Sequence, residues 1–194
     1  MSKETIEECS ILGLDPGSKN AGYAVLRVRI KKKKLQYKIE ETGKLKNLLT
    51  DLKIPHRKIL QKHVGEVRAI IKKYGIKYVL AERYMARGGK QATIEYVNQM
   101  LGALEYALPV EVTQISAATW KNRINRIFDL KKYYKECYRV EPHEIDAVFQ
   151  SMWLAEKKFD RKFTDKFGKS KNRKNLTKVI ECKTTSVLKK QKKR

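Results

Sequence analysis

The stretch ILGLDPGSKNAGYAVLRV, residues 11–28, predicts a β-hairpin near the start of the chain. The apolar run over residues 11–14 is typical of a buried strand. A turn follows it, because Pro16 presets φ and Gly17 permits a positive φ. Residues 21–28 are apolar again and predict the second strand, so the hairpin opens a sheet.

Alternating strand and helix patterns follow the hairpin. Strands are expected at residues 35–40, 77–82 and 110–115, and helices at residues 59–74, 91–108, 117–126, 130–138 and 142–158. The lysine-rich flanks of the third strand suit a sheet edge. The spacing of Phe159, Phe163 and Phe167 predicts that a short helix continues beyond residue 158. A hairpin followed by alternating units predicts an α/β fold with a mixed sheet and helices on its faces.

Composition points to a polyanionic partner. The chain has 194 residues, with 45 Lys and Arg against 21 Asp and Glu, and its net charge is +24. Lys and Arg bind nucleic acid by releasing counterions from its phosphates, so nucleic acid is the leading partner. An anionic membrane surface is the rival, although no apolar stretch is long enough to span a membrane.

Cysteine usage and the first residues bear on the compartment. Three cysteines without a CxxC spacing argue against a disulfide framework and a zinc site, so we expect a reducing compartment. The acidic start MSKETIEECS is not typical of a secretory signal. The expected location is cytoplasmic or nucleoid-associated, or the host cytoplasm if the source is viral. The lysine-rich composition favours a phage or viral source.

The positive charge is concentrated at the end of the chain. Residues 157–194 hold 16 basic and 3 acidic residues, a net charge of +13. We therefore expect a globular domain over residues 1–158 and a basic tail over residues 159–194. The tail is expected to bind phosphates without sequence preference.

Three carboxylates interrupt apolar runs. Asp15 ends the first strand, and Glu82 ends the apolar run YVLA in the same way. Asp146 lies in the first turns of the last helix. Asp15 has the alternative role of a turn residue, and Asp146 that of a favourable charge near a helix N-terminus. Glu82 has the alternative of an ion pair with Arg83 or Arg87. If the two strands are neighbours, the three carboxylates come together.

Clustered carboxylates in a phosphate-binding protein suit Mg²⁺, with Mn²⁺ able to substitute. His143 shares a helical face with Asp146 and either joins this site or is structural. Two such ions about 3.5–4 Å apart activate water and stabilise the leaving oxygen of a phosphodiester. The carboxylates therefore predict a metal-dependent nuclease.

The same residues resemble the RuvC Holliday junction resolvases, within the RNase H-like (retroviral integrase) superfamily. The stretch ILGLDPGSKNAGYAVL is similar to the opening of that family, and HEIDAVFQSMW is similar to its acidic helix. The resemblance spans about residues 10–158. It implies a five-stranded mixed sheet whose first three strands are antiparallel. It also implies a homodimer that nicks two opposed strands of a four-way junction, with residues 91–108 as the dimer-forming helix.

The resemblance carries roles to individual residues. Asp15, Glu82 and Asp146 match the metal-binding carboxylates, and His143 matches a fourth catalytic position. The neighbouring acid Glu144 is expected to be able to take over the role of His143. DNA-contacting positions are expected at and after the end of the fourth strand and after Trp120: Arg83, Tyr84, Met85, Arg87, Lys90 and Lys121. Either Tyr84 or Met85 is the expected aromatic or apolar wedge at the junction centre. Trp120 itself is expected in the core.

These observations predict a two-metal-ion endonuclease that resolves four-way DNA junctions in recombination, replication or repair. One alternative is a debranching nuclease with a broader range of branched DNA, or an RNase H-like enzyme acting on hybrids. Another is a basic architectural protein that keeps the fold and binds DNA without cutting it.

Overall fold

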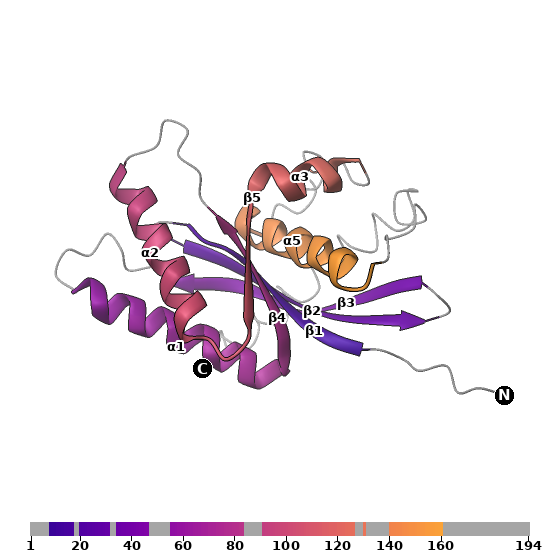
Figure 1. Ribbon diagram of the computed structural model, residues 1–194, viewed down its shortest axis with the longest axis horizontal. Helices are drawn as coiled ribbons and strands as arrows, with labels where there is room; N and C mark the ends of the chain where they lie inside the picture. Colours follow the sequence, from indigo (N-terminus) through magenta and orange to yellow (C-terminus); the bar gives the residue numbers. More distant parts are fainter. Residues whose placement is uncertain are drawn as a thin grey trace.

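The computed structural model describes residues 8–17, 20–31, 34–46, 55–83, 91–126, 130 and 140–160 (Figure 1). The strands are β1 (Glu8–Asp15), β2 (Asn20–Lys31), β3 (Lys34–Lys46), β4 (Ile76–Arg83) and β5 (Glu111–Ser116). The helices with described bounds are α1 (His56–Tyr74), α2 (Gln91–Ala107), α3 (Ala117–Asn125) and α5 (Pro142–Lys158). No helix among these residues is long and apolar enough to cross a membrane.

The five strands form one mixed sheet in the order β3-β2-β1-β4-β5. β1 pairs antiparallel with β2, and β2 with β3, whereas β4 runs parallel to both β1 and β5. This topology confirms the predicted α/β fold and its antiparallel first three strands. The central position of β1 and β4 matters for the site, because both strands end at the same edge of the sheet.

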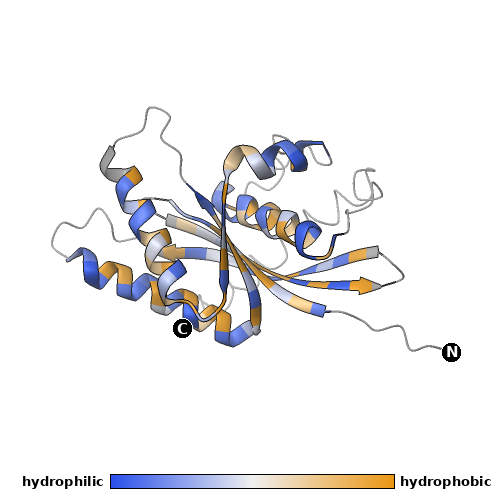
Figure 2. Cartoon of the chain, viewed as in Figure 1, coloured by the Kyte–Doolittle hydropathy of each residue, from blue (hydrophilic) through white to orange (hydrophobic). Residues whose placement is uncertain are grey.

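Helices cover both faces of the sheet, and each face has its own hydrophobic core. α5 and α3 lie on one face, and α1 and α2 lie on the other (Figure 1). Alternate side chains of a strand point to opposite faces, so Ile11 joins the core under α5 while Leu12 joins the core under α1 and α2. Figure 2 shows the resulting alternation of hydrophobic and hydrophilic residues along strands and around helices.

Two glycines set how closely α5 approaches the hairpin. A Cβ added at Gly13 of β1 would lie 2.1 Å from the carbonyl oxygen of Ala147, and one at Gly22 of β2 would lie 2.3 Å from that of His143. Any side chain at either position would push the helix away. Glycine therefore lets the first half of α5 rest directly on the strand backbones.

Most predicted boundaries agree with the structure, with two differences. β3 continues to Lys46 because its pairing with β2 persists through a register shift between Val25 and Leu26, which breaks the alternation in the sequence. The predicted continuation of α5 is wrong at Phe159, since α5 ends at Lys158 and Asp160 has a φ of 46°. The helix expected at 130–138 lies almost entirely outside the described residues.

The predicted end of the first helix at residue 74 is confirmed. Gly75 adopts a left-handed conformation, with φ 59° and ψ 46°, and its N–H bonds to the carbonyl of Ile71. Glycine is the residue best suited to that conformation. The turn reverses the chain directly into β4.

Candidate active site

Asp15 and Glu82 lie side by side at the ends of two parallel strands. Leu14 of β1 pairs with Ala81 of β4, so the residue that follows each one occupies the same level of the sheet. Asp15 is only 6 % exposed, and Glu82 is half-buried. The two carboxylates therefore share a poorly hydrated edge of the sheet, as expected from the sequence.

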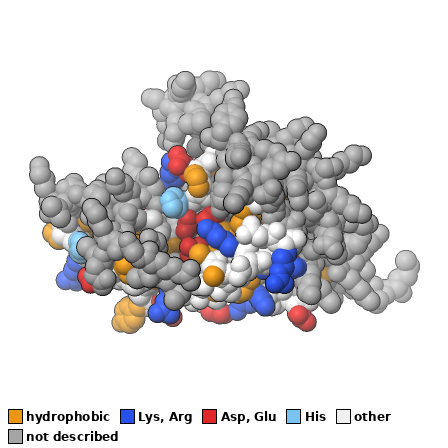
Figure 3. Space-filling view, turned by 90° about the horizontal axis from the view of Figure 1, so that it is seen from above, with side chains coloured by type: hydrophobic (Ala, Val, Ile, Leu, Met, Phe, Trp, Pro, Cys, Tyr) orange, Lys and Arg blue, Asp and Glu red, His pale blue; other side chains and the backbone are white. Residues whose placement is uncertain are grey.

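The first turns of α5 bring His143 and Asp146 to the same edge. His143 Nδ1 lies 2.5 Å from Asp15 Oδ2, and Lys121 Nζ of α3 lies 3.0 Å from Asp146 Oδ2. The close contact of α5 with Gly13 and Gly22 positions these groups. In the view of Figure 3, acidic side chains adjoin a histidine and basic side chains near the centre of the face.

Glu82 is held by two donors that sequence reasoning did not assign to the site. Trp120 Nε1 donates to Glu82 Oε2 at 2.8 Å, and Gln150 Nε2 donates to the same oxygen at 3.2 Å. Both donors are fully buried. Gln150 had a detectable signal, because it is a polar residue one helical turn after Asp146 on the apolar helix. Trp120 is a core residue, as predicted, and a hydrogen-bond donor as well.

Negative charge accumulates at this edge of the sheet. Burial raises the pKa of Glu82 to about 7, and the neighbouring charge of Asp15 adds to the effect, while the Trp120 N–H and Lys121 act against it. The hydrogen bond to Asp15 raises the pKa of His143. Burial alone would lower the pKa of Lys121, but the charge of Asp146 and its neighbours raises it. The site thus stabilises cations and disfavours a further anion.

The carboxylates suit a hard divalent cation, although no ligand cage is assembled. Within the described ranges, no three His, Cys, Asp or Glu side chains are arranged to hold a metal ion. Instead, Asp15 contacts His143 and Asp146 contacts Lys121, so a basic side chain lies next to each of these two carboxylates. Carboxylate oxygens are the donors that Mg²⁺ and Mn²⁺ prefer, and Asp15, Glu82 and Asp146 are the residues able to supply them.

The remaining predicted DNA-contacting positions form two groups. Arg83 is exposed at the end of β4, next to the site, and pairs with neither Glu82 nor Asp15 in any described contact. Tyr84, Met85, Arg87 and Lys90 lie outside the described residues.

Glu144 has no described contact with Asp15, Glu82 or Asp146, and its ability to take the place of His143 stays a prediction. The next residue of a helix is rotated by about 100°, which turns Glu144 away from Asp15. It is buried near Thr42 and Lys44 of β3, and burial raises its pKa.

The fold has counterparts among solved structures. Thermus thermophilus RuvC in complex with a Holliday junction substrate is 14 % identical, with a TM-score of 0.60, and the match covers 77 % of this chain and 96 % of that chain. A second T. thermophilus RuvC structure is 12 % identical, with a TM-score of 0.60 over 78 % of this chain and 97 % of that one. A fowlpox virus resolvase bound to Holliday junction DNA is 13 % identical, covering 76 % and 97 %, with a TM-score of 0.43.

The sequence itself has no recognised match. No protein-family model matches the chain, and a search among curated proteins finds no match. The chain is therefore similar to RuvC in its fold, with carboxylates collected where β1 and β4 end against the start of α5.

Proposed function

We propose that the protein is a structure-selective DNA endonuclease that resolves four-way junctions. The observation that carries the proposal is the meeting of Asp15, Glu82, His143 and Asp146 at one edge of a RuvC-like sheet. A net charge of +24 supports branched DNA as the substrate, because its phosphates attract a basic protein.

The proposed cofactor is a pair of Mg²⁺ ions, for which Mn²⁺ would substitute. Asp15, Glu82 and Asp146 would hold them, and Trp120 and Gln150 would keep Glu82 oriented. When bound, such ions activate water and stabilise the leaving oxygen of a phosphodiester.

The side chains around the carboxylates have separate tasks in this proposal. His143 orients Asp15 through its Nδ1 and moves a proton at the same edge of the sheet. Lys121, held by Asp146, presents a positive charge to the phosphate. Arg83 and the stretch 84–90 would contact DNA beside the scissile bond.

Paired nicks need two active sites, so we propose that the protein acts as a homodimer through α2. The outer side of α2 includes Tyr106, which is 95 % exposed, and Gly102, where an added Cβ would meet no atom within 4 Å. An exposed aromatic ring one turn from an open glycine supports close contact with a second copy.

A cleavage panel tests the proposal. A mobile four-way junction, a flap, a duplex and an RNA–DNA hybrid are incubated with the protein and Mg²⁺, or with EDTA. We expect paired, ligatable nicks in the junction alone, and none with EDTA. Equal cutting of flaps would indicate a debranching nuclease, and cutting of the hybrid would indicate an RNase H-like enzyme. Tight junction binding without any cutting would indicate an architectural protein.

A further inference from the structure

The outward face of α1 carries positive charge that the candidate active site does not use. Arg57, Lys58, Lys62 and Lys72 are all exposed, and we call these four residues the α1 basic face. At 3.6 residues per turn, they fall within about 140° of arc around the helix axis. The opposite side of α1 is apolar and buried, so this face points to solvent.

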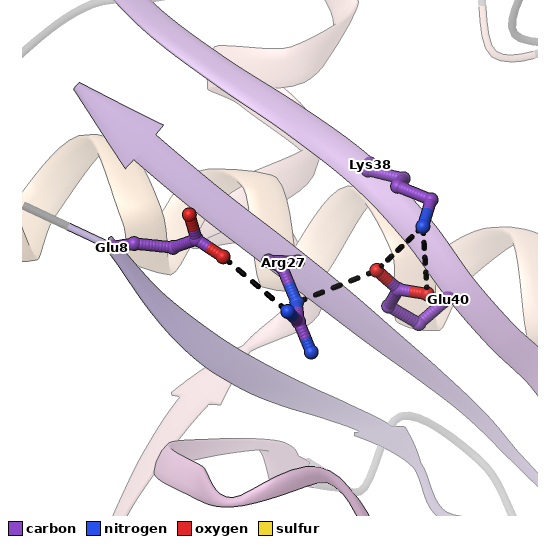
Figure 4. Close-up of polar contacts among 4 residues, drawn as sticks. All are labelled: Glu8, Arg27, Lys38 and Glu40. Carbon is purple, nitrogen blue, oxygen red and sulfur yellow. Dashed lines mark hydrogen bonds and ion pairs between the residues drawn. The ribbon is translucent and has the colours of Figure 1, made fainter. Parts of the chain in front are cut away.

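Some exposed cations elsewhere on the protein have acidic partners. At the far end of the sheet, Arg27 lies 3.4 Å from both Glu8 and Glu40, and Lys38 lies 3.0 Å from Glu40 (Figure 4). By contrast, none of the four side chains of the α1 basic face forms an ion pair within the described part of the chain. A surface made only for solubility would carry charges of both signs.

The two helices on this side of the sheet differ sharply in charge. α1 has six Arg and Lys residues and one acid, Glu66, which is half-buried. The neighbouring α2 has two Glu residues and no Lys or Arg. On this side of the sheet, the positive charge of the two helices therefore lies on α1 alone.

A glycine lies in the middle of the α1 basic face. Gly65 is exposed within the helix, and an added Cβ would meet no atom within 4 Å. Glycine inside a helix is destabilising relative to alanine, and no contact with a described residue requires it here. A smooth surface between two groups of cations suits the close approach of a phosphate backbone.

We propose that the α1 basic face binds the phosphate backbone of one duplex arm of the DNA substrate. Gly75 reverses the chain between α1 and β4, so the first turn of α1 lies toward the sheet edge that carries Glu82. A duplex arm leaving that edge would follow the helix. α1 is about 27 Å long, which corresponds to about eight base pairs. The proposal rests on the proposed function, since it takes the DNA to be the substrate of that site.

The test compares two variants with the same loss of charge. One carries Lys58→Gln, Lys62→Gln and Lys72→Gln, and the control carries Lys38→Gln, Lys77→Gln and Lys157→Gln, all exposed and outside α1. Lysine and glutamine have similar helix propensities, so the α1 variant is expected to fold. Circular dichroism checks the folding of both variants. Junction binding is measured by fluorescence anisotropy in EDTA over a range of salt concentrations, with arms of about 6 and about 20 base pairs.

We expect the α1 variant to weaken binding of the long-armed junction by roughly tenfold or more at low salt. The slope of log K against log salt should become shallower by about 2.7, which is about 0.9 for each of three lost phosphate contacts. The control variant should change the slope much less, and the short-armed junction should not distinguish the two variants. Gly65→Glu, which fits the open space, should weaken long-arm binding in the same way.

Other results would overturn the inference. Equal losses in both triple variants would mean that only the overall field matters. Loss of binding to phosphatidylserine vesicles by the α1 variant, with DNA binding intact, would assign the face to a membrane surface. Because binding is read without metal, a protein that binds long arms through α1 yet fails to cut would refute the proposed function and leave this inference standing.

Discussion

At the scale of single residues, Glu82 shows how buried donors define the candidate site. Its Oε2 accepts from Trp120 and Gln150, which are 38 and 68 residues away in the sequence. Among the described residues, no hydrogen bond involves its Oε1, which is therefore open to other partners. Loss of a residue that hydrogen-bonds to a metal-ligating side chain typically lowers metal affinity by about 10–100-fold.

Trp120→Phe tests this orientation. The substitution removes the N–H donor and keeps most of the apolar ring, so we expect Mn²⁺ affinity to fall by about tenfold. Titration calorimetry or electron paramagnetic resonance with Mn²⁺ alone measures the affinity without DNA. The matched control is Trp153→Phe, a second tryptophan of the same core with no described contact to Glu82. Unchanged Mn²⁺ binding by Trp120→Phe would mean that the indole is only a core residue.

His63 of α1 should make stability depend on pH. It is 3 % exposed, its Nδ1 has no hydrogen-bond partner, and burial lowers its pKa to about 4. The unfolded chain therefore binds more protons between pH 6.5 and 4. We expect the free energy of unfolding to decrease as pH falls through that window, by at most about 3 kcal/mol.

Urea titrations at several pH values measure this decrease. His63→Leu should remove it, because leucine does not titrate and needs no hydrogen bond. His56→Gln, at an exposed histidine of the same helix, should leave the decrease in place. The same pH dependence in His63→Leu as in the wild type would assign it to other groups.

At the scale of elements, the contact of α5 with β1 and β2 links stability to the site. Gly13→Ala would place a methyl group against the Ala147 carbonyl. We expect it to cost about 1–3 kcal/mol in the free energy of unfolding, because overpacking strains a close contact. Cleavage should fall further, since α5 also carries His143 and Asp146.

Gly102→Ala in α2 serves as the control for the change in stability alone, because Gly102 belongs to the proposed dimer contact. Its added methyl group meets open space within the chain, so alanine should stabilise the helix by up to about 1 kcal/mol. Chemical denaturation compares the two variants, and cleavage by Gly13→Ala is compared with that of the wild type under conditions where both are folded. A Gly13→Ala protein with wild-type stability and activity would show that α5 adjusts freely.

Strand ends and helix faces were predictable from sequence because the responsible signals are local. Asp15 and Glu82 each end an apolar run, and Asp146 follows a helix start marked by Pro142. The donors to Glu82 were not predictable, since their pairing depends on how α3 and α5 cross the sheet. The end of β3 was missed because a register shift breaks the alternation. The position of Glu144 depends on helix rotation against β3.

At the scale of the whole molecule, the distribution of charge separates the proposed DNA-binding surfaces from the candidate site. The candidate site holds clustered carboxylates, while α1 and the sequence beyond residue 158 are strongly basic. A basic protein gains affinity from many phosphate contacts and loses it steeply as salt increases. Affinity and catalysis should therefore respond to different substitutions.

Removal of residues 160–194 tests this separation. We expect weaker junction binding and a flatter dependence on salt, because the removed segment has 14 basic and 3 acidic residues. The cleavage rate at saturating protein should stay close to that of the full chain. Anisotropy and single-turnover cleavage measure the two quantities. A truncated protein that no longer folds would show that the segment is structural.

The most direct measurement compares junction cleavage by the wild type and by Asp15→Asn in Mg²⁺, with junction binding measured on the same samples. Asparagine keeps the shape of the side chain and removes its charge. We expect Asp15→Asn to bind the junction as tightly as the wild type and to cut it at least about a hundredfold more slowly. Full cleavage by Asp15→Asn would contradict the assignment of this carboxylate cluster as the active site.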